Sequence, residues 1–134
     1  MKVTFLGTGT STGIPTIGVE RESCLSSDKR DNRLRSSILI EYKSKSILID
    51  CGPDFRQQML RINKTKVDAI FFTHEHADHT AGLDDVRPIS FHHGKIPIYA
   101  HQRVVDNLKI RFDYLFDKKG DYPGSPHVYP NIIT

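Results

Sequence analysis

Residues 67–79, Val67-Asp-Ala-Ile-Phe-Phe-Thr-His-Glu-His-Ala-Asp-His79, are the stretch that decides the fold. Val67 to Phe72 form a nearly continuous apolar run, which is typical of a strand covered on both faces. The loop that leaves this strand carries three histidines and an aspartate: His74, His76, Asp78 and His79. The stretch therefore predicts a buried strand that brings a dense group of metal-binding side-chain types to one edge of a sheet.

These four side chains form a candidate metal site. Imidazole and carboxylate groups suit Zn²⁺, Mn²⁺ or Fe²⁺. His74 and His76 point the same way on extended backbone, so both can reach one ion, while Asp78 and His79 can reach a second ion about 3.5–4 Å away. The alternative is a solvated histidine-rich loop, with Asp78 capping a helix that begins at Thr80. The order His-x-His-x-Asp-His directly after a buried strand favours the metal interpretation.

Outward from this stretch, short β-branched runs alternate with helical patterns. The expected strands are 2–6, 37–42, 46–50 and 96–100, and residues 43–45 join the middle two as a hairpin. The expected helices are 55–63, 80–86, ending before Pro88, and 104–116. Residues 18–35 form an extended surface segment, and the chain from Asp117 onward is a loop with no closing element. The pattern predicts an α/β fold.

Composition narrows the class of protein. A chain of 134 residues with 37% hydrophobic side chains predicts one globular domain. A net charge of +3 is too diffuse to predict a nucleic-acid partner. The apolar runs are far shorter than the roughly 20 residues that span a bilayer, so we expect a cytoplasmic protein without membrane contact. Two cysteines, Cys24 and Cys51, build neither a disulfide framework nor a cysteine zinc site.

The segment from His74 to His79 resembles the signature of the metallo-β-lactamase superfamily. The opening Phe5-Leu-Gly-Thr-Gly9 and the turn Leu48-Ile-Asp-Cys-Gly52 match that superfamily as well. Within it, the chain is most similar to the phosphoribosyl cyclic phosphodiesterases of phosphonate breakdown. Three stretches carry this closer similarity: Arg33–Ser37, Asp50–Gln58 and Thr73–Asp85. Ribonuclease Z has a similar opening, Asp-Cys-Gly turn and metal motif.

The resemblance implies a fold and a set of ligands. Residues 1–134 would be the N-terminal part of one αββα sandwich, a mixed sheet with flanking helices. Two divalent ions, Zn or Mn with Fe as a further option, would be held by His74 and His76 and by Asp78 and His79. Asp78 would also orient the nucleophilic water. The remaining metal ligands are expected beyond residue 134.

Asp50 has two interpretations. The resemblance makes it a carboxylate that steadies the metal loop, which agrees with the need of a ligating histidine for an acceptor on its other ring nitrogen. The alternative is an ordinary turn residue at the end of a strand.

Three functions follow as hypotheses. The first is metal-dependent hydrolysis of a small cyclic or nucleotide-like phosphodiester. The second is transfer-RNA 3′ processing of the ribonuclease Z type. The third is a half-domain that binds metal weakly or not at all and cannot turn over substrate. Because half of a sandwich leaves an apolar sheet face and strand edges uncovered, we also expect this chain to associate with itself.

Several other residues carry weaker signals. Related phosphodiesterases bind a structural zinc through three cysteines, whose positions here are Val19, Arg21 and Cys24, so no structural zinc is expected. The glycines of residues 7–13 are misplaced for a dinucleotide fingerprint, and no nucleotide cofactor is expected. His92 and His93 either lie near the cleft or face solvent, His101 is expected to be a turn residue, and His127 is not expected to be a ligand. The basic run of Arg30, Arg33 and Arg35 is expected to be a solvated face rather than a phosphate site.

Overall fold

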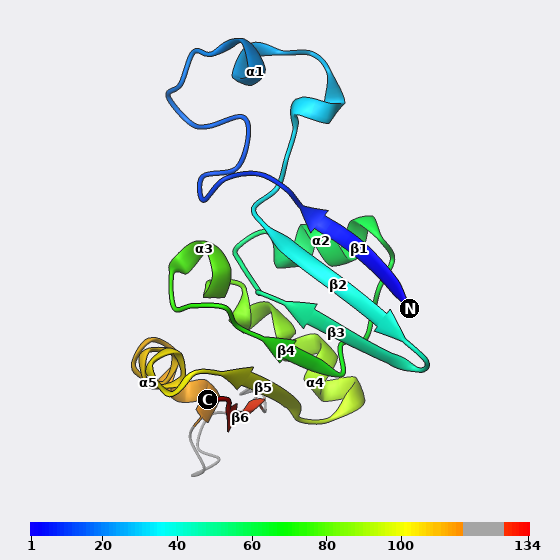
Figure 1. Ribbon diagram of the computed structural model, residues 1–134, viewed down its shortest axis with the longest axis vertical. Coiled ribbons are helices and arrows are strands. Elements are labelled where there is room, and N and C mark those ends of the chain that lie inside the picture. The colour runs from blue at the N-terminus through cyan, green and yellow to red at the C-terminus, as the bar shows by residue number, and fades with distance from the viewer. Residues whose placement is uncertain (117–127) are drawn as a thin grey trace.

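The computed structural model describes residues 1–116 and 128–134. In these residues six strands form one mixed sheet in the order β1 to β6 (Figure 1). Their bounds are β1 Lys2–Gly7, β2 Ser37–Tyr42, β3 Lys45–Ile49, β4 Ala69–Phe71, β5 Ile96–Ala100 and β6 Val128–Ile132. Strands β1, β2 and β3 pair antiparallel, and β3, β4, β5 and β6 pair parallel.

Helices pack on one face of this sheet, and α2 and α4 lie behind it in Figure 1. The helices are α1 Glu22–Leu25, α2 Phe55–Arg61, α3 Ala77–Thr80, α4 Arg87–His93, α5 Gln102–Arg111 and α6 Asp113–Phe116, with short 3₁₀ turns at η1 Lys29–Asp31 and η2 Leu83–Val86. A row of fully buried side chains crosses four strands in register, Leu39, Leu48, Ile70 and Ile98. It forms one core with apolar side chains of α2, η2, α4 and α5.

The opposite face of the sheet is also apolar. Phe5, Ile38, Ile49, Phe71 and Tyr99 follow one another across five strands in register. Phe5 is 64% exposed, and the rings of Phe71 and Tyr99 stack with centroids 4.6 Å apart. The expected architecture is therefore confirmed: one mixed sheet with helices flanking one face, and a second apolar face that no helix in the described residues covers (Figure 1).

The expected hairpin, the strand 96–100 and the start of the helix at Phe55 are confirmed, whereas the segments around prolines differ. Pro88 does not end a helix: it lies in the first turn of α4, where its missing N–H is not needed. The chain from Asp117 onward is not entirely a loop, because Val128–Ile132 pair with β5 as β6. Pro130 is tolerated there since β6 lies at the end of the sheet in the described residues.

Other expected elements are present but shorter or divided. The strand expected over 67–72 is only Ala69–Phe71, and the helix expected over 104–116 breaks at Phe112, whose φ of −132° and ψ of 46° are not helical. Residues 18–35 do project from the sheet as a surface segment, but they contain α1 and η1 (Figure 1). None of the helices within 1–116 and 128–134 combines the length and the apolar content that crossing a bilayer requires.

Candidate metal centre

Two loops meet at the carboxyl edge of the sheet to form the candidate site. One follows β3 and begins with Asp50, and the other follows β4 and carries the histidine motif. Backbone hydrogen bonds join them: Asp50 N–H donates to the Phe71 carbonyl at 2.8 Å, and Cys51 N–H donates to the His79 carbonyl at 2.8 Å. Because β3 and β4 run parallel as neighbours, their carboxyl ends bring residues nearly thirty positions apart into contact.

Two glycines allow this close approach. A Cβ atom on Gly52 would stand 2.0 Å from the Asp78 carbonyl oxygen, and one on Gly82 would stand 2.0 Å from the Gly52 carbonyl oxygen. Real Cβ atoms essentially never come so near another atom. The sequence placed Gly52 in a turn that matches the superfamily, but nothing local reveals which backbone will pass beside a glycine.

The side chain of Asp50 anchors the loop after β4 that carries the histidine motif. Its carboxylate is buried, and it accepts hydrogen bonds from Thr73 N–H at 2.8 Å, from the Thr73 hydroxyl at 2.8 Å and from His79 Nδ1 at 2.7 Å. The backbone of Asp50 has a φ of 61°, a left-handed conformation that aspartate adopts more readily than most residues. One side chain thus both ends β3 and anchors the loop after β4.

This contact fixes the state of the His79 ring. A carboxylate accepts but does not donate, so Nδ1 of His79 carries the hydrogen and Nε2 is the atom left to face outward. The Nε2 atom lies 3.1 Å from Oδ2 of Asp78. Two ligands that each sit about 2.1 Å from a tetrahedral ion are about 3.4 Å apart, so this pair is spaced for a shared cation.

His74 lies against the ring of His79, and His76 lies against the ring of His74. The centroids of His74 and His79 are 4.1 Å apart, and those of His74 and His76 are 4.6 Å apart. Nδ1 of His74 lies 3.0 Å from the Thr73 hydroxyl. The structure therefore brings together all four side chains expected from the motif, although no group of three or more His, Cys, Asp or Glu side chains among the described residues is arranged to hold an ion by itself.

The remaining histidines lie elsewhere or act as caps. His92 and His93 are exposed and end α4, just before β5. Because β4 and β5 are parallel, they lie at the edge opposite the motif, so their expected position near the cleft is wrong and their exposure to solvent is confirmed. His101 begins α5, where its ring accepts a hydrogen bond from Arg103 N–H. His127 lies outside the described residues.

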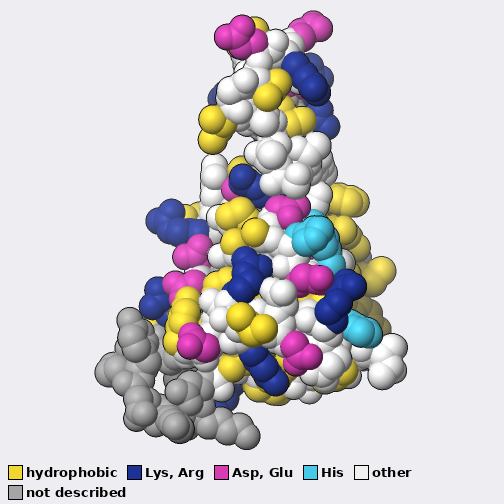
Figure 2. Space-filling model, turned by 90° about the vertical axis from the view of Figure 1, so that its left-hand side faces the viewer, with side chains coloured by type: hydrophobic (Ala, Val, Ile, Leu, Met, Phe, Trp, Pro, Cys, Tyr) yellow, Lys and Arg dark blue, Asp and Glu magenta, His cyan; other side chains and the backbone are white. Residues whose placement is uncertain are grey.

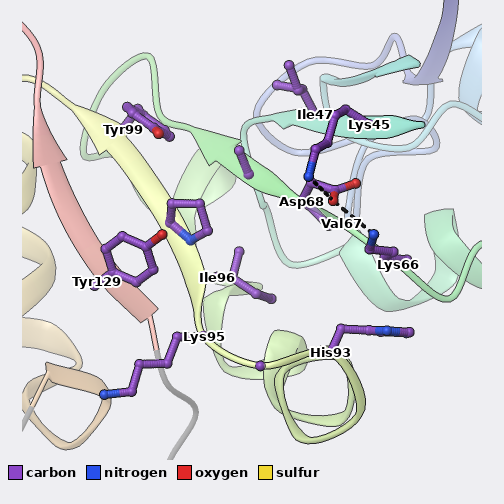
Figure 3. Close-up of a pocket in the computed structure, with 13 residues that line it drawn as sticks. Lys45, Ile47, Lys66, Val67, Asp68, His93, Lys95, Ile96, Tyr99 and Tyr129 are labelled. Atoms are coloured by element: carbon purple, nitrogen blue, oxygen red, sulfur yellow. Dashed lines mark hydrogen bonds and ion pairs between the residues drawn. The ribbon is translucent and has the colours of Figure 1, made fainter. Parts of the chain in front are cut away.

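A cavity of about 540 Å³ also lies at the edge away from the motif (Figure 3). Figure 3 shows Lys45 and Lys66 turned toward Asp68, with nitrogen to oxygen distances of 3.2 and 2.9 Å. Partial burial raises the pKa of Asp68, but the hydrogen bond from Ser46 N–H and the contacts with the two lysines outweigh it and hold that pKa below its ordinary value. His93 borders the same cavity.

The arginines and cysteines contact their own chain. Arg30 pairs with Asp28, and Arg35 donates to Asp54 at 3.0 Å and to the Ser11 carbonyl at 2.8 Å, so Arg35 joins three loops rather than forming part of a solvated face. Burial raises the pKa of the Cys51 thiol well above its ordinary value, so that thiol stays neutral. On the side where α3 and α5 lie, histidine, acidic and basic side chains are mixed at the surface (Figure 2).

The fold and these contacts define an α/β protein with a histidine- and aspartate-rich centre at the carboxyl edge of a mixed sheet. The family model described as "Beta-lactamase superfamily domain" matches residues 45–130. The chain belongs to this family, the metallo-β-lactamase superfamily, as the motif from His74 to His79 indicated.

Similar proteins are longer than this chain. A crystal structure of a diphosphatase from the PhnP family superimposes with a TM-score of 0.87 at 43% identity, over 98% of this chain and 50% of that one. A protein of Porphyromonas gingivalis named octanoyltransferase is 47% identical over 94% of this chain and 25% of its own length. A ribonuclease Z of Methanococcus maripaludis is 33% identical over 73% of this chain and 28% of its own length. The expected similarity to the phosphoribosyl cyclic phosphodiesterase (PhnP-like) group is thus confirmed. The chain spans half or less of the length of each of these relatives.

Proposed function

We propose that this chain is part of the catalytic domain of a metal-dependent hydrolase that cleaves small phosphodiesters, cyclic or nucleotide-like. Residues 1–134 form the amino-terminal part of that domain, and later residues complete the metal site. The observation that carries the proposal is the Asp50–His79–Asp78 arrangement, in which a buried carboxylate orients a histidine toward a second carboxylate 3.1 Å away.

The residues present fit divalent cations. His74 and His76 would hold one ion, and Asp78 and His79 would hold a second, so that the donor set would be imidazole nitrogen and carboxylate oxygen. Such a set suits Zn²⁺ or Mn²⁺, and also Fe²⁺. When bound, the ions bring the pKa of a coordinated water toward neutrality and offset the negative charge of a phosphodiester.

The protein's own groups then act on orientation and charge. Asp50 keeps the hydrogen of His79 on Nδ1, so Nε2 stays available as a ligand. In known metal sites, losing a carboxylate that holds a ligating histidine in this way costs about 10- to 100-fold in metal affinity. Asp78 lies beside Nε2 of His79, and about one-fifth of its side chain is exposed. Its carboxylate accepts a hydrogen bond from the attacking water and orients it, which is its proposed catalytic role.

Two of the similar proteins are named for other activities. Ribonuclease Z is the second candidate, supported by the 33% identity to the Methanococcus maripaludis protein, but the diphosphatase resembles this chain more closely and over more of its length. The octanoyltransferase shares only a quarter of its length with this chain. An acyl-transfer activity therefore need not belong to the shared quarter, and we do not propose it.

Metal removal tests the proposed function. We expect the whole protein to hydrolyse bis(p-nitrophenyl) phosphate and a nucleoside 2′,3′-cyclic phosphate, to lose the activity after chelation, and to regain it with Mn²⁺ or Zn²⁺. A phosphodiesterase activity that survives complete chelation contradicts the proposal. Cleavage of a precursor transfer RNA without turnover of either small substrate supports the ribonuclease Z candidate instead. For the 134-residue chain by itself, metal well below stoichiometry together with no activity supports the inactive half-domain.

We also propose that the 134-residue chain by itself binds a second copy through the open sheet face. Phe5, Val3 and Tyr129 on this face are 64%, 46% and 44% exposed, and exposed apolar faces of this kind are typical of interaction surfaces. Light scattering is expected to give at least twice the monomer mass, and Phe5→Lys is expected to lower it. The control Ile110→Lys changes a residue of α5 that is 81% exposed and should have no effect. A strictly monomeric wild-type chain contradicts this proposal.

A further inference from the structure

An arginine of α5 contacts the histidine motif from the side of the helix. One terminal nitrogen of Arg111, Nη1, donates to the Glu75 carbonyl at 2.9 Å and to the Thr80 hydroxyl at 3.0 Å. Glu75 lies between His74 and His76, so the first bond holds the peptide that joins the two histidines. No pattern in the sequence indicates this contact, because its partners are 36 positions apart.

Thr80 extends the contact to the next peptide. Its side chain is fully buried, and its hydroxyl donates to the His76 carbonyl at 2.9 Å while accepting from Arg111. The carbonyls of Glu75 and His76 are therefore held in one network. Arg111 contacts the Glu75 carbonyl directly and the His76 carbonyl through Thr80. Rotation of either peptide would break a hydrogen bond in this network.

A second arginine of the same helix adds a weaker contact. Arg103 lies two turns before Arg111, on the same side of α5, and its Nη2 atom is 3.2 Å from Oε2 of Glu75. The Arg103 side chain is 70% exposed, so solvent screens this ion pair and its contribution is small. Arg111 is also an exposed residue, but its two hydrogen bonds reach a backbone carbonyl of the motif and the buried Thr80 hydroxyl, so it makes the more direct link between α5 and the motif.

We infer that Arg111 is a positioning residue: it fixes the backbone from Glu75 to His76 and thereby the directions in which His74 and His76 present their ring nitrogens to a metal. The inference rests on the proposed function. Arginine suits this position because the two hydrogens of one guanidinium nitrogen point to two acceptors at fixed angles, whereas a lysine ammonium has no such planar geometry.

Cobalt binding tests this inference without relying on catalysis. The whole protein, stripped of metal, is titrated with Co²⁺ against a competing chelator, and affinity and the visible Co²⁺ spectrum are recorded. Arg111→Gln is expected to weaken Co²⁺ binding about 10- to 100-fold, as other changes behind metal ligands do, and to alter the spectrum. Arg111→Lys is expected to recover part of the affinity.

Lys109→Gln is the matched control, because it removes one positive charge from the exposed surface of the same helix. We expect wild-type affinity for this variant. Wild-type affinity in Arg111→Gln would overturn the inference, and so would an equal loss in Lys109→Gln, which would show a general effect of charge.

Thr80→Val keeps the test informative if Arg111→Gln folds poorly. This variant retains the guanidinium but cuts its link to the His76 carbonyl, and it is expected to weaken Co²⁺ binding severalfold. Where the Arg111→Gln protein folds, the double variant should bind about as weakly as Arg111→Gln alone, because both changes act through one network. Unchanged binding in Thr80→Val, or losses that multiply in the double variant, would contradict the inference.

The same titration separates this inference from the proposed function. Co²⁺ binding that is lost in His76→Ala supports the metal centre whatever Arg111 does, so an unaffected Arg111→Gln protein would then remove only the role of Arg111. A wild-type protein that binds no Co²⁺ would overturn both.

Discussion

Replacing His76 with alanine is expected to lower the metal-dependent hydrolysis of a small phosphodiester by at least about 10³-fold, equivalent to about 4 kcal/mol of lost transition-state stabilisation. The reason is that His76 shares one proposed ion with His74, so its loss removes half of the ligands that this loop supplies there. His76 is partly exposed and begins α3 without a side-chain capping bond, so the fold should survive the change. The measurement is kcat/KM with Mn²⁺ or Zn²⁺, together with the metal content by elemental analysis.

His93→Ala is the matched control for this prediction. It removes an exposed histidine at the far edge of the sheet, next to His92 and away from the motif. Wild-type activity and metal content are expected in this variant. If His76→Ala keeps most of the activity and all of the metal, the proposed centre is wrong.

Gly52→Ala is expected to lower the free energy of unfolding by about 3 kcal/mol or more, the upper end of the effects of overpacking. A methyl group at Gly52 would stand 2.0 Å from the Asp78 carbonyl oxygen, and that atom belongs to backbone that cannot turn aside as a side chain can. To make room, the loop after β3 must separate from the loop that carries Asp78 and His79. Urea unfolding of the variant and wild type measures the change, and weaker metal binding should accompany it.

Gly18→Ala provides the comparison. Gly18 has a φ of 74° and no atom within 4 Å of the position of a Cβ, so alanine there incurs backbone strain alone, about 1–2 kcal/mol. Gly52 is not among the residues with positive φ, so its cost is steric. A Gly52→Ala protein as stable as Gly18→Ala would show that the two loops do not meet as closely as described.

Local patterns explain most of what could be predicted. The β-branched runs in residues 37–42 and 46–50, which flank the short polar stretch 43–45, identified the hairpin, because such runs favour strands and a short polar stretch between them favours a turn. The order His-x-His-x-Asp-His identified the family, since so specific a spacing seldom arises without its chemistry. The same local reasoning failed at Pro88, which was expected to stop a helix but begins one, because only the position of the proline within the helix decides between these outcomes.

Contacts between distant segments were beyond prediction. β6 forms because Val128–Ile132 pair with the edge of β5. The loop-like composition of this part of the sequence did not indicate a strand. Nothing in the sequence distinguishes Arg111 from other charged residues of its helix, and only the packing of α5 brings it beside Glu75. Asp50 had two interpretations, a turn residue and a support for the motif, and the structure confirms both. Its backbone makes the turn after β3, and its side chain contacts His79.

The sequence by itself therefore determined the family, the α/β pattern and the four residues from His74 to His79 that carry the candidate chemistry, because each depends on spacing along the chain. The tertiary structure alone decided how those residues are held. The parallel pairing of β3 with β4 brings Asp50 to His79, the glycines at 52 and 82 let the two backbones touch, and the packing of α5 brings Arg111 to Glu75. These contacts join segments far apart in sequence, so they are fixed only when the sheet and its helices assemble.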